Sequence, residues 1–450
     1  MKLNRMIEKL KGSYVRLFAV GFALLIFWGA FLLSLPIATK SGQGMSMVDA
    51  LFTATSATCV TGLIVADTYT NWSMFGQIVI LSLIQIGGLG FITIGVYIAV
   101  LLKKKIGLWG REAIHESVST LQSAGSVKMT KRIIQGTFFV EGIAAIFLSV
   151  KFIPMLGVIE GIYYGIFHAI SGFCNAGFDL MGRWEPYSSL CLFQGDILIN
   201  VVIMSLIAIG GLGFVVWDDL VKNKWHWKKY LLHTKMVLVI TGILIFGSAL
   251  IFYLLEKNNL FAGLSVKDTV LSSLFAAVTP RTAGFNTVDL AAMTDGSKLL
   301  TTILMFIGGS PGSTAGGVKT TTVAVMLLSS IAMIRSSHGT NVFGRRLEDE
   351  SVRKAATVFF VNLSMALVAI LVILAIQPLD FMDICMEVFS AIGTVGMSTG
   401  VTRQLNDVSK LIIILLMYCG RLGSLSFVLV FAQKKKVPPV LNPQEKMLVG

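Results

Sequence analysis

Long apolar stretches alternate with short amphipathic stretches along the whole chain, and this order repeats four times. The first apolar stretch, residues 14–35, is long enough to cross a hydrocarbon core of about 30 Å. The next, residues 45–57, is too short to cross, and a second long stretch follows at 73–102. The pattern predicts a spanning helix, a re-entrant helix and a second spanning helix in each repeat.

The other three repeats follow the same order. Their expected spanning segments are residues 133–153, 197–221, 236–255, 298–334, 355–376 and 410–431, and their expected short helices are 161–172, 266–278 and 380–391. We therefore expect an all-α polytopic membrane protein with eight transmembrane helices and four re-entrant pore helices. These would form four membrane–pore–membrane repeats around a central pore. The predicted boundaries are repeat 1 at 1–105, repeat 2 at 106–225, repeat 3 at 226–345, repeat 4 at 346–433 and a cytoplasmic tail at 434–450.

Each short helix runs into a loop of small and polar residues that ends on a glycine. From Gly62 to Gly177 is 115 residues, from Gly177 to Gly284 is 107, and from Gly284 to Gly396 is 112. Irregular backbone at membrane depth is stable only where protein or a water-filled cavity surrounds it. Four such loops at one spacing therefore predict a single pore rather than four unrelated turns.

The loops have the composition of a cation filter. A cation that crosses a membrane needs a substitute for its hydration shell, and rings of backbone carbonyls supply one. Glycine lets these carbonyls point inward, and the negative C-terminal ends of the short helices favour a cation nearby. The candidate filter residues are Thr58, Cys59, Val60, Thr61, Gly62, Phe173, Cys174, Asn175, Ala176, Gly177, Arg281, Thr282, Ala283, Gly284, Gly393, Thr394, Val395 and Gly396.

A second glycine motif lies inside the last span of each repeat, beginning at Gly87, Gly210, Gly308 and Gly420. In the third repeat it belongs to a run of glycines around a proline at 305–319, which cannot be a continuous helix. This run predicts a flexible plug on the cytoplasmic side of the filter. The candidate gate residues are Gly308, Gly309, Ser310, Pro311, Gly312, Ser313, Thr314, Ala315, Gly316, Gly317, Lys319 and Arg421. Gly317 is not followed directly by lysine, so a phosphate-binding loop is not expected here.

Composition supports a membrane protein, because 55% of residues are hydrophobic and 14% are charged, with a mean hydropathy of +0.79. The net charge of +13 does not indicate nucleic-acid binding. Of 37 Lys and Arg residues, 26 lie in alternate connections, at 1–16, 103–132, 222–235, 335–354 and 434–446. This positive-inside pattern places both termini in the cytoplasm and favours contact with anionic lipid.

Five polar side chains at membrane depth are candidates for special roles. Arg421 is expected to donate to loop carbonyls, to repel a second cation, or to bridge helix carbonyls, and Lys319 lies beside it in the gate run. Arg281 is expected to brace the back of its loop, and a carboxylate is one candidate partner for it. Asp67 is either an outer-mouth residue or an ordinary loop aspartate. Glu141 is either a buried polar partner or part of a cation site.

Other candidates favour simpler interpretations. His168 has no metal-ligand companions, so we expect it to pack in the core. The five cysteines show no CxxC spacing, and the two in the loops, Cys59 and Cys174, suit small pore-lining side chains better than a metal site. The basic N-terminus and the apolar run behind it lack a small-residue cleavage site, which predicts a retained first helix.

The loop sequences resemble the filter loops of the Trk/Ktr/HKT superfamily of potassium transporters, and the chain is most similar to the membrane subunit of a Ktr system. The residues that carry the resemblance are Thr58–Gly62, Asn175–Phe178, Thr279–Asn286 and Gly393–Gly396. In that family a glycine in all four loops goes with potassium selectivity, and a serine in the first loop goes with sodium permeation. The resemblance therefore implies potassium as the transported substrate, an intramembrane gate loop at 305–319 and no organic cofactor in this chain.

The same resemblance implies partners. It predicts a homodimer in the cell membrane, resting on a cytoplasmic ring of nucleotide-binding regulatory subunits, and a dependence on sodium. The alternative within the same class is a sodium-permeable or sodium-coupled cation transporter. An intramembrane enzyme would need a catalytic group such as HExxH or a Ser/Lys pair, and neither has spacing support, so no enzymatic activity is expected. A receptor or scaffold would not need four matched loops.

Overall fold

The computed structural model describes residues 14–90, 93, 126–337, 339–423, 445 and 447. Four features expected from the sequence lie largely outside these residues. They are the N-terminal basic cluster, the basic connection with Lys103–Lys105, the ends of the second span in the first and fourth repeats, and the tail 434–450. The described chain is almost entirely helical, with one two-stranded hairpin.

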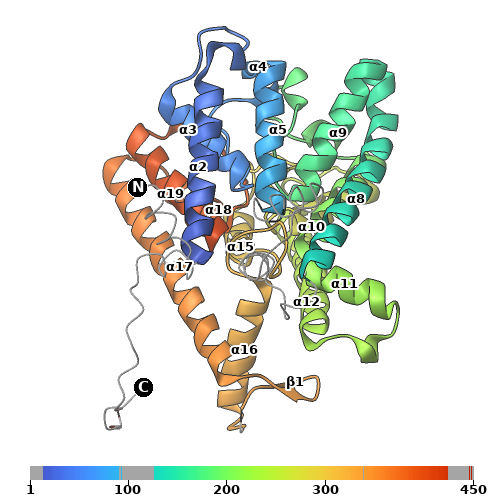
Figure 1. The fold of residues 1–450 in the computed structure, drawn as a ribbon, viewed down its shortest axis with the longest axis vertical. Coiled ribbons are helices and arrows are strands. Elements are labelled where there is room, and N and C mark those ends of the chain that lie inside the picture. The colour runs from blue at the N-terminus through green and yellow to red at the C-terminus, as the bar shows by residue number, and fades with distance from the viewer. Residues whose placement is uncertain are drawn as a thin grey trace.

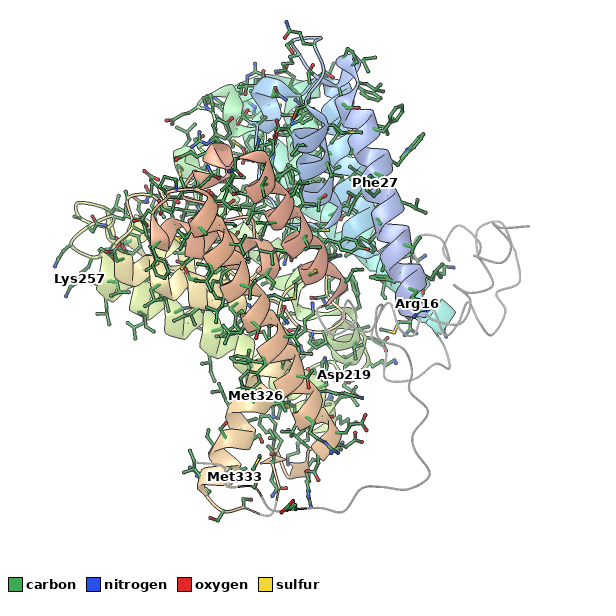
Figure 2. All side chains as sticks on the ribbon, turned by 90° about the vertical axis from the view of Figure 1, so that its left-hand side faces the viewer. Arg16, Phe27, Asp219, Lys257, Met326 and Met333 are labelled. Carbon is green, nitrogen blue, oxygen red and sulfur yellow. The ribbon has the colours of Figure 1, made fainter. Side chains whose placement is uncertain are left out.

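Within the described residues, four helical segments are long and apolar enough to cross a membrane. They are α2 (Tyr14–Ser34), α8 (Ser126–Leu156), the continuous run Leu232–Glu256 and α17 (Asp349–Ile376). The outer face of α2 leaves Leu24, Phe27 and Trp28 exposed by 65%, 61% and 61% (Figure 2). A contiguous apolar face of this kind suits lipid and not water. These segments begin the four structural units, which we number one to four in chain order.

Each unit continues with a shorter helix: α3 (Met47–Thr58), α9 (Val158–Cys174), α14 (Val266–Val278) and α18 (Phe381–Gly393). Three of them have a side-chain N-cap, from Ser46, Ser265 and Asp380, which satisfies a backbone N–H in the first turn. All four lie within a few residues of the short helices that the hydrophobic pattern predicts.

The second membrane helix of a unit does not run straight through. Three of these helices are 16 residues long: α5 (Met74–Leu89), α10 (Ile197–Leu212) and α19 (Asp407–Leu422). Sixteen residues reach only about 24 Å. Gly90, Gly213 and Gly423 follow them with φ of 81°, 97° and 84°, a conformation that glycine adopts without steric cost.

The prediction of one unbroken second span at 197–221 is therefore wrong. The chain bends by 96° between α10 and α11 (Phe214–Asn223), at Gly213. In unit three the corresponding helix α15 (Asp295–Phe306) also ends early, and α16 (Thr320–Ile334) resumes after an irregular segment at 307–319. The interruption that the sequence predicts in the third unit is present, and the second unit shares the break.

Several short elements complete the described chain. The run Leu232–Glu256 contains α12 (Leu232–Gly242), the π-helix η5 (Ile243–Gly247) and α13 (Ser248–Glu256). The remaining short elements are η1 (Pro36–Ala38), α4 (Thr68–Asn71), η2 (Met181–Arg183), η3 (Cys191–Phe193), η4 (Trp227–Lys229) and η6 (Val401–Gln404). Helices α16 and α17, joined by strands β1 (Asn341–Val342) and β2 (Arg345–Arg346), project beyond the other helices (Figures 1 and 2).

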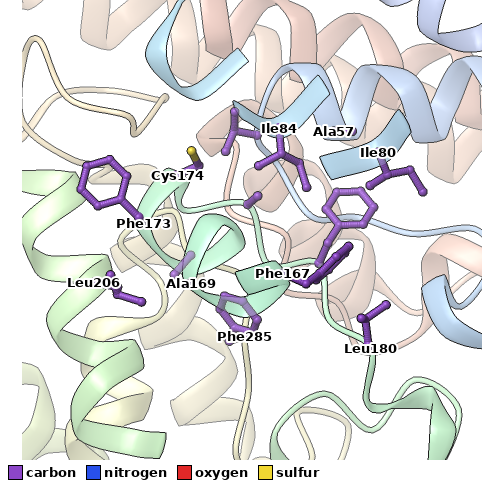
Figure 3. Close-up of a cluster of buried hydrophobic side chains, with 14 of the residues drawn as sticks. Ala57, Ile80, Ile84, Phe167, Ala169, Phe173, Cys174, Leu180, Leu206 and Phe285 are labelled. Atoms are coloured by element: carbon purple, nitrogen blue, oxygen red, sulfur yellow. The ribbon is translucent and has the colours of Figure 1, made fainter. Parts of the chain in front are cut away.

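The four units pack in a closed cycle. Helix α5 contacts α9, α10 contacts α14, α15 contacts α18, and α19 contacts α3. Buried apolar side chains pack between neighbouring units, and one cluster combines Ile80, Phe167 and Phe285 from units one, two and three (Figure 3). The packing places the C-terminal ends of all four short helices inside the cycle.

An ion pair closes the cycle between its last and first members. Lys410 Nζ of α19 lies 2.6 Å from Asp49 Oδ1 of α3, and the two side chains are only 14% and 23% exposed. Partly buried pairs of this kind are stronger than exposed ones, because breaking them leaves a poorly solvated charge.

We expect Lys410→Met to lower the free energy of unfolding by about 1–2 kcal/mol, for the reason just given. The matched control is Lys354→Met, which removes an exposed pair with Glu350 within one helix, and should cost about 0.5 kcal/mol or less. Thermal unfolding of the purified protein in detergent measures both. Equal shifts for the two variants would contradict a closing role for the Lys410–Asp49 pair.

Candidate functional site

The four loops that follow the short helices share one backbone conformation. We call them glycine loops one to four, at residues 58–62, 173–177, 281–284 and 393–396. In each, the residue two before the final glycine is left-handed, as is the glycine itself. The φ values are 57° at Val60, 61° at Asn175, 68° at Thr282 and 53° at Thr394, then 97° at Gly62, 68° at Gly177, 80° at Gly284 and 95° at Gly396.

Left-handed backbone is costly for Val60 and Thr394, because their branched side chains crowd the main chain. Helix-terminating hydrogen bonds hold it in place. The N–H groups of Thr61, Ala176 and Val395 each donate to the carbonyl five residues earlier, at a distance of 2.8 Å. This is the pattern of a Schellman helix end. Loop three lies farther from the end of its short helix, because α14 ends six residues before Gly284, and it uses other bonds, including Ala283 N–H to Thr279 O at 3.0 Å.

A hydroxyl at the end of each short helix braces its loop. Ser56 Oγ and Ser390 Oγ accept from the N–H groups of Gly62 and Gly396, each at 3.0 Å. In loop two Ser171 Oγ donates to Phe178 O at 2.6 Å, and in loop three Thr279 Oγ1 donates to Phe285 O. Sequence reasoning missed these hydroxyls. The signal was present, since a serine lies six residues before the glycine in three of the four loops.

The four loop glycines form a ring. A Cβ atom added to Gly62 would lie 2.5 Å from Ala176 O, and one added to Gly177 would lie 2.7 Å from Ala283 O. At Gly284 the same atom would lie 2.7 Å from Val395 O, and at Gly396 it would lie 2.2 Å from Thr61 O. Each glycine thus faces a carbonyl of the next loop, in the order one, two, three, four and back to one. Side chains are excluded there because the backbones touch.

Close approach of backbones also explains the glycine motif in the second helices. A Cβ on Gly87 would lie 1.9 Å from Thr58 O, one on Gly210 would lie 2.1 Å from Phe173 O, and one on Gly420 would lie 2.2 Å from Ile392 O. In these three units, the carbonyl concerned lies four residues before the loop glycine, whereas a Cβ on Gly308 of unit three would lie 2.4 Å from Gly316 O. The second helix therefore packs its backbone directly on the end of the short helix, which explains why both motifs recur with similar offsets.

One face of the ring opens into a cavity of about 150 Å³, which we call the outer cavity. All four loop glycines line it, together with residues that follow them, among them Asp179, Tyr187, Asp289 and Arg403. Asp179 Oδ1 accepts from Met181 N–H at 2.8 Å. Burial raises the pKa of the Asp179 carboxyl to about 7, against the lowering effect of that hydrogen bond and with a further rise from Asp67.

The opposite face of the ring is covered by residues 307–319, which lie within the region 305–319 that the sequence singled out as a gate; residues 305 and 306 belong to α15. We call the covering residues the 307–319 segment. Its backbone is hydrogen-bonded to the glycine motifs of two other units, through Ser310 N–H to Gly211 O at 3.0 Å, Thr314 N–H to Gly210 O at 3.3 Å and Gly317 N–H to Gly420 O at 3.3 Å. Thr314 Oγ1 also donates to Phe173 O at 3.3 Å. A Cβ on Gly316 would lie 2.1 Å from Thr394 Oγ1, so the segment lies directly against loops two and four.

Two half-buried cationic side chains, Arg421 and Lys319, donate hydrogen bonds to carbonyl groups around this segment. Arg421 donates to Thr314 O of the segment and to Gly87 O and Gly88 O at the end of α5. Lys319 Nζ donates to Ala315 O at 2.7 Å. Arg421 thus contacts both loop and helix carbonyls, two of the three arrangements that the sequence left open.

Arg281 differs from its expected arrangement. Its side chain is 5% exposed, and its Nε has no hydrogen-bond partner. Within the described part of the chain no ion pair joins it to a carboxylate, so the expected carboxylate brace is not formed there.

The other singled-out residues have structural partners. Glu141 accepts from Gln85 Nε2 at 3.2 Å and is buried behind loop two, near Cys174. Asp67 accepts from the N–H groups of Thr70 and Tyr187 and joins the connections of units one and two.

His168 is buried with both ring nitrogens engaged, by Tyr164 O at 2.7 Å and by Leu180 N–H at 3.2 Å, as its packing role requires. The five cysteines are free. Across the described residues, no group of three His, Cys, Asp or Glu side chains is arranged to hold a metal ion.

Comparison with known proteins agrees with this geometry. The family model described as TrkH, cation transport protein, matches residues 24–438. The chain belongs to this family of cation transport proteins. It is 40% identical to the potassium/sodium uptake protein NtpJ of Enterococcus hirae and 40% identical to the Ktr system potassium uptake protein B of Bacillus subtilis. Both alignments cover 97% of this chain and 97% of the relative.

More distant relatives also align over nearly the whole chain, at lower sequence identity. The Ktr system potassium uptake protein B of Vibrio alginolyticus is 32% identical over 98% of this chain and 96% of its own. The fold resembles the crystal structure of the potassium transporter TrkH from Vibrio parahaemolyticus, with a TM-score of 0.70 and 20% identity, over 92% of this chain and 85% of that chain. The recognition from loop motifs is thereby confirmed at the level of the family.

The close contacts in the ring predict how a substitution at a loop glycine changes the free energy of unfolding. Gly284→Ala should lower the free energy of unfolding by about 1–3 kcal/mol more than Gly263→Ala does, because overpacking adds to backbone strain. Both glycines have φ of 80°, but nothing lies within 4 Å of a Cβ at Gly263. Thermal unfolding of both variants in detergent is the measurement: the loss at Gly263 reports backbone strain alone, and the additional loss at Gly284 reports the close contact with the next loop. Equal losses would show that the loops do not touch at Gly284.

Proposed function

We propose that this chain takes up potassium ions across the cell membrane through a channel-like path formed by the four glycine loops. The observation that carries the proposal is the ring, in which each loop glycine faces a main-chain carbonyl of the next loop. Carbonyl oxygens around one axis replace the water that a cation loses on entering a membrane. The 18 candidate filter residues belong to these loops.

Electrostatics of the site favour a cation. The short helices α3, α9, α14 and α18 end at the ring, and a helix C-terminus carries a partial negative charge. Asp179 and Asp289 line the outer cavity on the approach to the ring. A path with these charges attracts cations and disfavours anions, and no step of bond-making chemistry is part of it, which supports a transporter and not an enzyme.

Potassium is the preferred substrate because all four loops end on glycine, as the family resemblance requires for potassium selectivity. The Bacillus subtilis and Vibrio alginolyticus relatives are named as potassium uptake proteins. A second candidate is a sodium-permeable or sodium-coupled transporter, and one observation favours it: the equally similar Enterococcus hirae relative is named as a potassium/sodium uptake protein.

The 307–319 segment is proposed as the gate. It lies across the face of the ring opposite the outer cavity, and hydrogen bonds to Gly210, Gly211 and Gly420 hold it there. Arg421 adds contacts to the segment and to α5. Because these bonds are individually weak, a modest input of energy can displace the segment and open the path.

Regulation and assembly are proposed from the family. The Ktr systems named for the relatives support a cytoplasmic ring of nucleotide-binding regulatory subunits beneath a homodimer of this chain. The alternate basic connections support a cytoplasmic location for both termini and contacts with anionic membrane lipid. The outer cavity then faces the outside, and the 307–319 segment faces the cytoplasm.

Uptake itself is the first test. Expression in a bacterial strain that lacks its own potassium uptake systems should restore growth at low potassium and give measurable rubidium uptake. Purified protein in vesicles should give the potassium-to-sodium flux ratio, which decides between the two candidates. Absence of any ion flux from correctly folded protein would overturn the transport proposal.

Gly62→Ser should relax discrimination against sodium. The new Cβ would lie 2.5 Å from Ala176 O, at a φ of 97°, so the carbonyl ring must shift. The matched control is Gly42→Ser, where φ is 70° and nothing lies within 4 Å of the Cβ. We expect the sodium-to-potassium flux ratio to rise about tenfold or more for Gly62→Ser, a change of about 1.4 kcal/mol in discrimination, and to stay unchanged for the control. Unchanged selectivity in both would exclude loop one from the filter.

Deletion of residues 309–316 should raise basal flux, because it removes most of the segment that covers the ring. The measurement is rubidium uptake per folded protein, with folding checked by size-exclusion chromatography. A folded deletion variant with lower flux than the wild type would reject the gate assignment.

A further inference from the structure

The outer cavity contains a cation–π contact that spans two distant units. The guanidinium carbon of Arg403 lies 4.2 Å from the centroid of the Tyr187 ring. Arg403 belongs to η6 in unit four, and Tyr187 lies between η2 and η3 in unit two. Both residues line the cavity whose floor is the four loop glycines.

The order of the ring places this contact across the mouth. Gly177 of unit two faces units one and three, and Gly396 of unit four faces units three and one. Units two and four are therefore diagonal to each other. A contact between their outer connections crosses the space in front of the ring.

Hydrogen bonds hold the backbone at both ends of the contact, within unit four for Arg403 and from unit one for Tyr187. On the side of unit four, the buried Glu387 of α18 accepts from Ser398 Oγ at 2.7 Å and from Thr402 Oγ1 at 2.6 Å. Gly400 N–H donates to Ser398 Oγ at 3.0 Å, which completes the turn that carries Arg403. On the side of unit two, Tyr187 N–H donates to Asp67 Oδ2 at 3.1 Å. These bonds fix the backbone on both sides of the contact, and the guanidinium of Arg403 rests on the Tyr187 ring at the mouth.

A fixed positive charge at the mouth of a cation path needs an explanation. Asp289, and Asp179 in its ionised form, attract every cation at this cavity, and they attract a divalent cation twice as strongly as a monovalent one. The positive charge of Arg403 repels both kinds of cation, and it repels a divalent cation twice as strongly as a monovalent one. A unit charge about 8 Å away in a water-like medium lowers local occupancy by about twofold for a monovalent ion and about fivefold for a divalent ion.

We propose that Arg403, stacked on Tyr187 across the outer cavity, is a specificity-determining residue that keeps divalent cations out of the path. The inference rests on the proposed function, since it assigns a role at the entrance of the same route. The contact does not seal the entrance. Tyr187 remains 38% exposed and Arg403 is exposed, and an exposed cation–π contact is weak enough to open and close readily.

The test is inhibition of rubidium uptake by external barium in cells that express the full chain. Arg403→Gln should lower the half-inhibitory barium concentration by about fivefold, and should lower the apparent KM for rubidium by only about twofold. Arg403→Lys keeps the charge and should stay within about twofold of the wild type. Tyr187→Leu removes the ring that positions the guanidinium and should shift inhibition in the same direction as Arg403→Gln, whereas Tyr187→Phe keeps the ring and should not.

The matched control is Arg183→Gln. Arg183 is also in an outer connection, but it pairs with Glu160 and is not among the residues that line the outer cavity. An equal change in barium inhibition for Arg183→Gln would show a general surface-charge effect and overturn the assignment. Unchanged inhibition in both Arg403→Gln and Tyr187→Leu, with rubidium uptake intact, would also overturn it. Loss of rubidium uptake in the wild type would instead refute the proposed function.

Discussion

Close approach of main chain to main chain is the constraint on which this structure depends. At the four loop glycines, the backbone of one unit comes so near to that of the next that a single methyl group would not fit. Three of the second helices meet the same restriction where they cross the ends of their short helices. Helix placement, loop conformation and the bracing hydroxyls all serve to bring peptide groups, and not side chains, to the centre.

This arrangement is stabilised by interactions that are individually modest. Schellman-type bonds hold left-handed residues at the ends of three short helices, and hydroxyl groups fix the glycines behind them. The cycle is completed by helix packing between neighbouring units and by the Lys410–Asp49 pair. The result is a rigid ring with a more weakly held segment on one face, attached through backbone hydrogen bonds to glycine motifs of units two and four.

Much of this could be predicted from the sequence because the determining residues are glycines at repeated offsets. The short helices, the glycine loops and the irregular 307–319 segment were each marked by local composition. The bend at Gly213 was not, because residues 197–221 read as one apolar run and the φ of 97° depends on tertiary packing against Pro311. The bracing serines looked like ordinary helix residues. The burial of Arg281 without a carboxylate partner, and the contact between Arg403 and Tyr187, depend on which units become neighbours, and no local pattern records that.

The four loops have similar backbones but different side chains, and they belong to one polypeptide. In a ring of four identical subunits, one codon change would alter all four positions together. Here the same change alters one quarter of the circle and leaves three quarters intact. Under the proposed function, a substitution in a single loop therefore changes ion preference in a smaller step than the same substitution repeated in all four loops.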